Sequence, residues 1–125
     1  MPPDHYSEQL TNEDVLRMLN AGKYVVDVDK GIVYGNRNRH RPIHVHVGGK
    51  TGNYCYVRLY DAPRSRGIPL AWVVWMAATR CPIPPDFEVH HCDEDPLNNS
   101  FTNLVCIHKN DHLKLHGKSC EEIPF

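Results

Sequence analysis

The chain has 125 residues, a formal net charge of −1 with neutral histidines, 41% apolar residues and 23% charged residues. These values predict one small globular domain and exclude an array of repeats. No apolar run approaches the roughly 20 residues that span a bilayer, and the polar N-terminus lacks the apolar core of a secretory signal, so we expect a cytoplasmic protein with no membrane partner.

Charge and cysteine content narrow the function only slightly. Nucleic-acid binders are often basic overall, so a neutral chain weighs mildly against that class. Three of the six residues at 36–41 are nevertheless arginines, which predicts either a local basic surface or an ordinary solvated loop. Five widely spaced cysteines without a C-x-x-C pair predict buried thiols, with a structural zinc site as the alternative.

Residues 1–22 form an N-terminal segment with one predicted short helix. Thr11 and Asp14 stand at the spacing of a capping box, in which a hydroxyl and a carboxylate satisfy free backbone amides. Gly22 is a natural stop for this helix. The helix has one apolar stripe, made by Val15, Leu16 and Leu19.

Residues 23–68 are predicted to form a small antiparallel sheet. Two β-rich runs flank a turn signal at 29–31, and the strictly alternating runs at 42–47 and 53–60 flank a glycine-rich turn. We interpret these runs as two hairpins or one sheet, and residues 61–68 as a loop. One face should point to the core with Ile43, Val45, Val47, Cys55, Val57 and Leu59.

The opposite face of this sheet carries tyrosine, histidine and arginine, which suit contact with phosphates, sugars and bases. Tyrosine is also common in strands, so a half-solvated face without a partner is the alternative. The residues of this face are His44, His46, Tyr54, Tyr56, Arg58 and Tyr60.

Residues 69–86 should hold a core helix and a proline-rich connection. Pro69 suits the first position of a helix. The following run LAWVVWMAATR, which reaches Arg80, has no polar face and is typical of a helix buried on most sides.

Residues 87–118 follow the order strand, polar loop, strand and helix, and they carry five histidines, of which those at 90, 91, 112 and 116 are the candidate site residues. His112 and His116 stand four apart on one helix face, whereas His90 and His91 are neighbours on a strand and point in opposite directions. A helix packed over the strands would bring His90 toward His112 and His116. Three imidazoles with open positions for substrate suit a catalytic metal ion. His91, beside the metal ion but not bound to it, could then take a proton from water.

This constellation strongly resembles the HNH nucleases, whose catalytic unit is the ββα-metal motif. His90 and His91 match the paired first element, Asn103 the central asparagine, and His112, nine residues later, the last histidine. His116 matches a further histidine of the colicin-type DNases. The upstream order of helix, hairpins, tryptophan-rich helix and proline-rich connection is similar to small phage and intron-encoded HNH homing endonucleases.

The resemblance implies an α+β fold, in which a small antiparallel β-sheet with short helices precedes a C-terminal ββα-metal motif. It implies metal-dependent hydrolysis of phosphodiester bonds in DNA by a phage or mobile-element protein acting in the host cytoplasm. A monomer should nick one strand, and a homodimer should cut both.

The resemblance also assigns roles to particular positions. His90 and His112, with His116 as a third ligand, would bind one divalent ion per chain, and zinc, magnesium, manganese and nickel all stay open. His91 would be the general base, and Asn103 would tie the loop together and orient His91. The residues of 23–68 expected to contact DNA are Arg37, Arg39, Arg41, His44, His46, Tyr54, Tyr56, Arg58, Arg64 and Arg66.

Two other functions stay open at the level of sequence. In a zinc-stabilised DNA-binding module without catalysis, the metal-binding histidines and Cys92 or Cys106 would close a four-coordinate site. A different metalloenzyme would have a similar metal site but no use for the basic surface. Neither the spacing nor the composition distinguishes a monomer from a homodimer.

Overall fold

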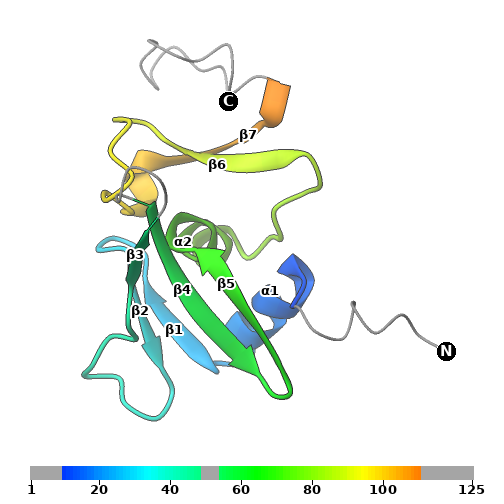
Figure 1. The fold of residues 1–125 in the computed structure, drawn as a ribbon, viewed down its shortest axis with the longest axis vertical. Helices are drawn as coiled ribbons and strands as arrows, with labels where there is room; N and C mark the ends of the chain where they lie inside the picture. Colours follow the sequence, from blue (N-terminus) through cyan, green and yellow to red (C-terminus); the bar gives the residue numbers. More distant parts are fainter. Residues whose placement is uncertain (1–9, 49–53, 111–125) are drawn as a thin grey trace, which may run out of the picture.

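The computed structural model describes residues 10–48 and 54–110, and their strands form three small antiparallel sheets, β1-β2, β3-β4-β5 and β6-β7 (Figure 1). This mixture of small antiparallel sheets and few helices confirms the predicted fold class. None of the helices within these ranges has the length and apolarity to span a bilayer. In chain order the elements are α1 (Asn12–Asn20), β1 (Tyr24–Asp27), β2 (Ile32–Gly35), β3 (His46–Gly48), β4 (Tyr54–Asp61), β5 (Arg64–Pro69), α2 (Leu70–Thr79), β6 (Phe87–His91), the 3-10 turn η2 (Phe101–Asn103) and β7 (Leu104–His108).

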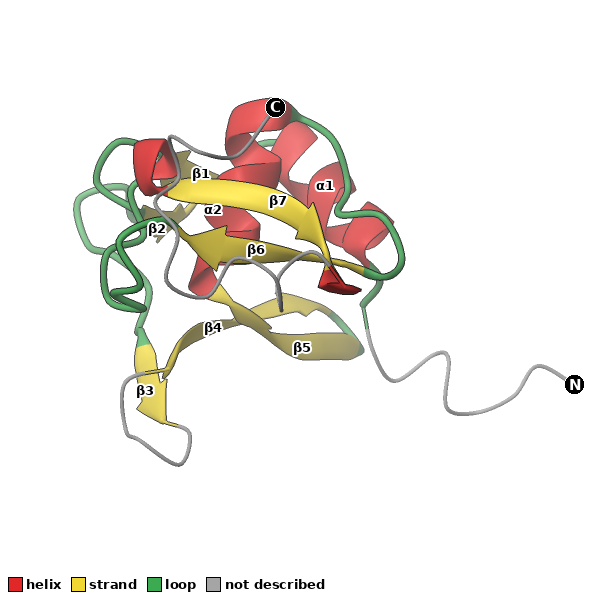
Figure 2. Ribbon diagram, turned by 90° about the horizontal axis from the view of Figure 1, so that it is seen from above, coloured by secondary structure: helices red, strands yellow, loops and turns green. Residues whose placement is uncertain are grey.

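The helix α2 is the centre of the fold. It contacts α1, η2 and strands of all three sheets, and Figure 2 shows the β6-β7 hairpin lying across it. Val73, Val74 and Met76 are fully buried on this helix. Each such side chain contributes about 1.5–3 kcal/mol by leaving water. The prediction of a core helix after Pro69 is confirmed, and the helix ends where Arg80 adopts a left-handed conformation with φ of 56°.

A capping box begins α1, as the sequence predicted. The Thr11 hydroxyl accepts from the Asp14 amide at 3.1 Å, and the Asp14 carboxylate accepts from the Thr11 amide at 3.0 Å. The same carboxylate pairs with Arg17 at 3.2 Å and with Arg64 at 2.9 Å. Partial burial acts to raise the pKa of Asp14, but the hydrogen bonds from Thr11 and Arg17 and the charge of Arg64 outweigh it and lower the pKa from 3.8 to about 2.

We expect Asp14→Asn to lower the free energy of unfolding by about 1 kcal/mol at neutral pH, because the variant loses an ionised cap. The folded-state pKa lies below its ordinary value, so this contribution is complete above the ordinary pKa of 3.8 and is lost as the pH falls through about 2. Urea denaturation from pH 7 to pH 2 should therefore show the two proteins converging. Glu13→Gln, on the exposed side of the same turn, is the control, and a gap that persists at pH 2 would contradict the role of the charge.

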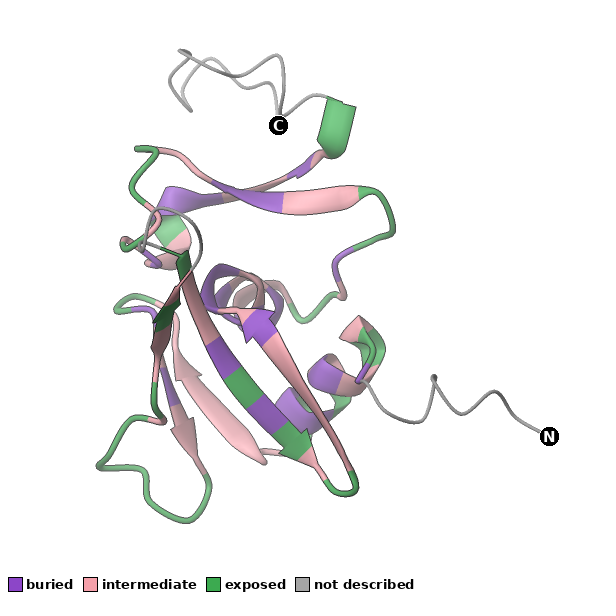
Figure 3. Ribbon diagram, viewed as in Figure 1, coloured by how far each residue is buried: buried purple, intermediate pink, exposed green. Residues whose placement is uncertain are grey.

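The strand β4 alternates between buried and exposed residues (Figure 3). Val57 and Leu59 are fully buried, whereas Tyr54 and Tyr60 are exposed, which confirms the two predicted faces of this strand.

The preceding strand is shorter than predicted, because only His46–Gly48 of β3 pairs with β4. Ile43 and Val45 pack against the core as expected, but Val47 is 58% exposed, so its predicted burial is wrong. Val47 does lie opposite Cys55 on the inward face. The end of the sheet carrying β3 projects beyond α2 (Figure 2), which leaves this valine in solvent.

The interpretation of residues 61–68 as a loop is wrong, because Arg64–Pro69 form β5. This strand pairs with β4 across a two-residue turn that sets Asp61 opposite Arg64. The sequence Arg-Ser-Arg-Gly has little intrinsic preference for a strand. Pairing with β4 and the complete burial of Ile68 stabilise it instead.

Candidate active site

The C-terminal unit begins with the hairpin of β6 and β7, which sets His90 opposite Val105 and His91 opposite Leu104. Neighbouring residues of a strand face opposite sides. His90 is accordingly buried, at 8% exposure, whereas His91 is only half-buried. The hairpin therefore separates the paired histidines into an inner and an outer imidazole, as the sequence predicted.

Asn103 fastens the loop between the two strands from a position that is 9% exposed. Its Nδ2 donates to Asp93 Oδ1 and to the carbonyl oxygen of Asn98, both at 2.9 Å, and its Oδ1 accepts from the Asp93 amide at 3.1 Å. Its backbone carbonyl accepts from the Cys92 amide at 2.7 Å. A single buried amide thus connects the two ends of the loop. These contacts agree with the predicted role of Asn103 in tying the loop together.

The carboxylate of Asp93 accepts hydrogen bonds from within this loop. It accepts from Asn98 Nδ2, from the Asp95 amide and from Asn103 Nδ2, each at 2.9 Å. These hydrogen bonds, with a smaller contribution from His91, lower the pKa of Asp93 to about 2. The group therefore stays ionised as an internal acceptor of the loop.

Sequence reasoning missed Asn99, whose side chain meets His91. The Asn99 Oδ1 lies 2.9 Å from His91 Nε2, and its Nδ2 donates to the carbonyl oxygen of Pro96 at 3.3 Å. Asn99 is 6% exposed. The only sequence signal is the asparagine pair at 98–99. Such a pair is typical of any polar loop.

Gly31, in the turn between β1 and β2, packs directly on Asn99. It has a φ of +69°, and a Cβ atom there would lie 2.6 Å from the Asn99 carbonyl oxygen. Gly22 has a similar φ of +77° with open space around it. The two glycines therefore form a matched pair that separates backbone strain from steric contact.

We expect Gly31→Ala to lower the free energy of unfolding by more than Gly22→Ala. Both variants lose about 1–2 kcal/mol by placing alanine in a left-handed conformation, and only Gly31→Ala must also displace Asn99. Urea denaturation of both variants measures the difference. Equal losses would show that the loop moves away from the added methyl group at no cost.

A cleft of about 380 Å³ opens beside His91. Its walls come from the start of β4 with Tyr54 and Cys55, from the first turn of α2 with Trp72, and from the loop with Asn99. The outer imidazole therefore faces a space that a substrate can enter. Segments far apart in the sequence form this space, so no local pattern could have predicted it.

An aromatic row on β3, β4 and the segment just before β3 leads to this cleft, and we define it as His44, His46, Tyr56 and Tyr54. The rings of His44 and His46 meet edge to face at 4.4 Å between centroids. His46 stacks on Tyr56 at 4.9 Å, and Tyr56 stacks on Tyr54 at 5.7 Å. Because Tyr54 also lines the cleft, the structure joins four of the expected DNA-contacting residues to the space beside His91.

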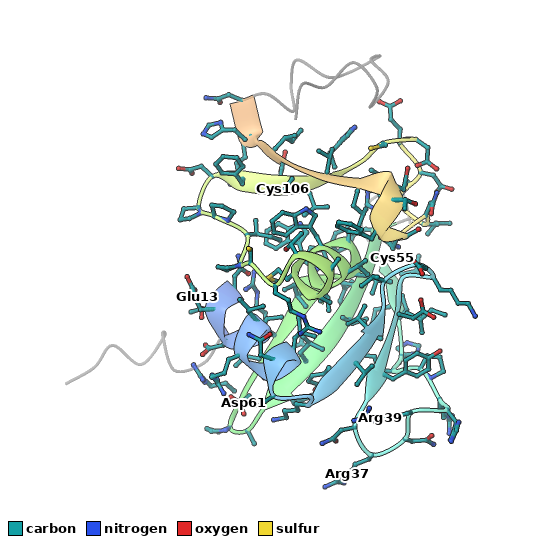
Figure 4. The ribbon with its side chains drawn as sticks, turned by 180° about the vertical axis from the view of Figure 1, so that it is seen from behind. Glu13, Arg37, Arg39, Cys55, Asp61 and Cys106 are labelled. Atoms are coloured by element: carbon teal, nitrogen blue, oxygen red, sulfur yellow. The ribbon has the colours of Figure 1, made fainter. Side chains whose placement is uncertain are left out.

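The arginine loop at 36–41 lies away from this cleft. Arg37, Arg39 and Arg41 are exposed, and no carboxylate in the described ranges pairs with them. Figure 4 shows Arg37 and Arg39 at the opposite end of the molecule from Cys106 of β7.

Arg64 and Arg66 contact α1 instead. Arg64 Nη1 pairs with Asp14 Oδ2 at 2.9 Å. Arg66 Nη1 donates to the Leu10 carbonyl oxygen at 3.1 Å and to Asn12 Oδ1 at 3.0 Å. Arg58, by contrast, is exposed on the same face of β4 as Tyr54 and Tyr56, and it donates to Ser65 Oγ at 3.3 Å.

His90 is the one predicted metal ligand among the described residues, because His112 and His116 lie outside them. Within 10–48 and 54–110 no three histidine, cysteine or carboxylate side chains converge on a common point. Cys55 and Cys106 carry free thiols that are partly buried, and the free thiol of Cys81 is exposed. Cys92 is disulfide-bonded, so the prediction of buried thiols is wrong at Cys81 and at Cys92. A disulfide removes Cys92 as a ligand of the alternative zinc site, since only the thiolate binds the metal.

Comparison with known proteins confirms the resemblance to HNH endonucleases. Residues 72–114 match the model of a family described as HNH endonuclease, and no curated protein matches the chain. A solved structure of the HNH homing endonuclease I-HmuI, concerned with its DNA binding and cleavage, is similar to 74% of this chain, with a TM-score of 0.59 and 22% identity. The match covers 51% of that chain, so the present chain spans about half its length. At this identity the likeness shows a shared fold.

Proposed function

We propose that this chain, an HNH endonuclease, hydrolyses phosphodiester bonds in DNA with the help of a divalent metal ion, and that His91 is its general base. The position of His91 carries the proposal. Its imidazole meets a cleft large enough for a nucleotide unit, beside a loop held by buried amides and at the end of the aromatic row. Such a base needs access to the substrate and a rigid setting, and His91 lines the cleft while its ring contacts the buried Asn99.

In the proposed reaction the His91 imidazole accepts a proton from the water that attacks the phosphorus atom. The loop fastened by Asn103 keeps the end of β6 from shifting as the scissile phosphate enters. Imidazole donors fit a transition ion, and His90, His112 and His116 would hold it. When bound, that ion would stabilise the negative charge of the phosphate and of the leaving 3′ oxygen.

The aromatic row and Arg58 would contact the DNA next to the cleft. Stacked rings present flat apolar faces to bases and sugars, and an exposed guanidinium suits a phosphate. The arginine loop would contact phosphates farther along the duplex. Arg64 and Arg66 are better explained as supports of α1, because their guanidinium groups already bind protein acceptors.

Plasmid cleavage tests the function directly. The full chain is incubated with supercoiled DNA and Mg²⁺, Mn²⁺, Ni²⁺ or Zn²⁺, with EDTA as the control and DNA of phage or mobile-element origin as a second substrate. Nicked products with at least one metal ion, abolished by EDTA, are expected, and linear products in a single event would indicate a dimer. DNA binding without cleavage under every condition would refute the nuclease and favour the zinc-stabilised binding module.

Replacing Arg37, Arg39 and Arg41 together by alanine should weaken DNA binding equally for unrelated sequences. Phosphate contacts carry no sequence information, and each one lost lowers the slope of log K against log salt by about 0.9. Fluorescence anisotropy with two unrelated duplexes at several salt concentrations measures this slope. Arg80→Ala, which removes one exposed arginine at the end of α2, is the control. An unchanged slope would exclude the arginine loop from the interface.

A further inference from the structure

We propose that Asn99 is a positioning residue, which holds the His91 ring with its proton on Nε2 and its lone pair on Nδ1. The inference rests on the proposed function in one respect only, namely that His91 is the base. Asn99 acts through His91 and is not assigned any contact with the reacting atoms.

The orientation of the Asn99 amide follows from its second contact. Its Nδ2 lies 3.3 Å from the carbonyl oxygen of Pro96, and a carbonyl oxygen can only accept a hydrogen bond. The amino group of the amide must therefore point at Pro96. The oxygen, Oδ1, then faces His91 Nε2 at 2.9 Å.

The tautomer of His91 follows from this orientation. An amide oxygen has no hydrogen to donate, so His91 Nε2 must carry the proton in this hydrogen bond. A neutral imidazole carries only one ring proton. The lone pair of His91 is thus left on Nδ1, and this is the nitrogen that can take a proton from water.

Two elements outside the β6-β7 hairpin, the β1-β2 turn and β4, lie against Asn99 and its loop. The backbone of Gly31 lies against its carbonyl group, where even a methyl group would not fit. Cys55 on β4 lines the same cleft as Asn99, and burial raises the pKa of its thiol although the neighbouring Asn99 side chain opposes the rise. The Phe101 amide donates to the Val28 carbonyl oxygen at 2.8 Å and ties the loop to the β1-β2 turn. The N-terminal sheets therefore set the orientation of the catalytic ring.

The test combines a spectroscopic signature with kinetics of the full chain. In protein labelled with ¹⁵N-histidine and saturated with Mg²⁺, the Nε2 proton of His91 should be protected from solvent exchange and visible. Comparison with His91→Gln assigns the signal. Asn99→Ala should lose the signal, Asn99→Asp should retain it because a carboxylate also accepts, and Leu97→Ala, at an exposed position of the same loop, should leave it unchanged.

The same variants are compared in DNA cleavage. Asn99→Ala should lower kcat by roughly 10–100-fold with little change in KM, as losing the partner of a reacting histidine typically does, and Asn99→Asp should recover most of this loss. A proton on Nδ1 in the native protein, a signal that survives in Asn99→Ala, or an unchanged kcat would each overturn the inference. The spectrum does not depend on cleavage, so an inactive chain with the expected spectrum would refute the nuclease and leave the tautomer assignment standing.

Discussion

The variant His91→Ala is expected to cleave DNA roughly 10²–10⁴-fold more slowly than the native protein, which is the range that general-base catalysis contributes. The side chain is half-buried, and its contact with Asn99 Oδ1 is a single hydrogen bond, so folding should change little. DNA affinity should also stay close to native, because the aromatic row and the arginine loop are intact. The loss should therefore appear in kcat and not in KM.

Single-turnover cleavage of a labelled duplex, together with anisotropy of the same duplex, separates the two effects. His40→Ala is the matched control, since His40 is an exposed imidazole in the arginine loop. This control should alter binding at most, with kcat unchanged. Native cleavage by His91→Ala would remove His91 from the mechanism, and lost binding would place it in the DNA interface instead.

Asn103→Ala is expected to lower the free energy of unfolding by about 3 kcal/mol, because it removes the three side-chain hydrogen bonds of a buried amide, each of which contributes about 1 kcal/mol. The Asp93 amide loses its acceptor, and the Asp93 carboxylate and Asn98 carbonyl lose a donor. Cleavage should fall as well, by roughly 10–100-fold, because the loop beside His91 is no longer held.

The conservative change Asn103→Asp is expected to be no better. Two of the three contacts require a donor, and a carboxylate would face the ionised Asp93 at the distance where the amide now donates. Urea denaturation of both variants, with Asn36→Ala as an exposed asparagine control, measures the loss. Native stability in Asn103→Asp would show that the loop depends on shape and not on these hydrogen bonds.

Local patterns of the sequence determined most of the secondary structure around α1, α2 and the hairpin of β6 and β7. The capping box of Thr11 and Asp14 depends on residues three apart, and the core helix depends on an unbroken apolar run. Motif spacing likewise indicated the resemblance to HNH endonucleases, because His90, His91 and Asn103 stand at fixed intervals along one short segment, and this segment lies within the residues that match the model of that family. Interactions of this kind join residues only a few positions apart, so they can be predicted from the sequence without knowledge of the tertiary structure.

Only the tertiary structure decided the features that join distant segments. β5 exists because β4 pairs with it, and the same pairing carries Arg64 and Arg66 to α1 and away from a solvent loop. The projection of β3 beyond α2 exposes Val47 although its alternation pattern is that of an inward residue.

The surroundings of His91 were likewise decided only by the tertiary structure. The cleft needs β4, α2 and the loop together, and the contact of Asn99 with His91 needs the β1-β2 turn beneath it. The sequence by itself predicted which residues would carry the chemistry, because their types and spacing are local properties. The packing of the three sheets on one helix decided which of them meet, because contacts between distant segments depend on the whole folded core.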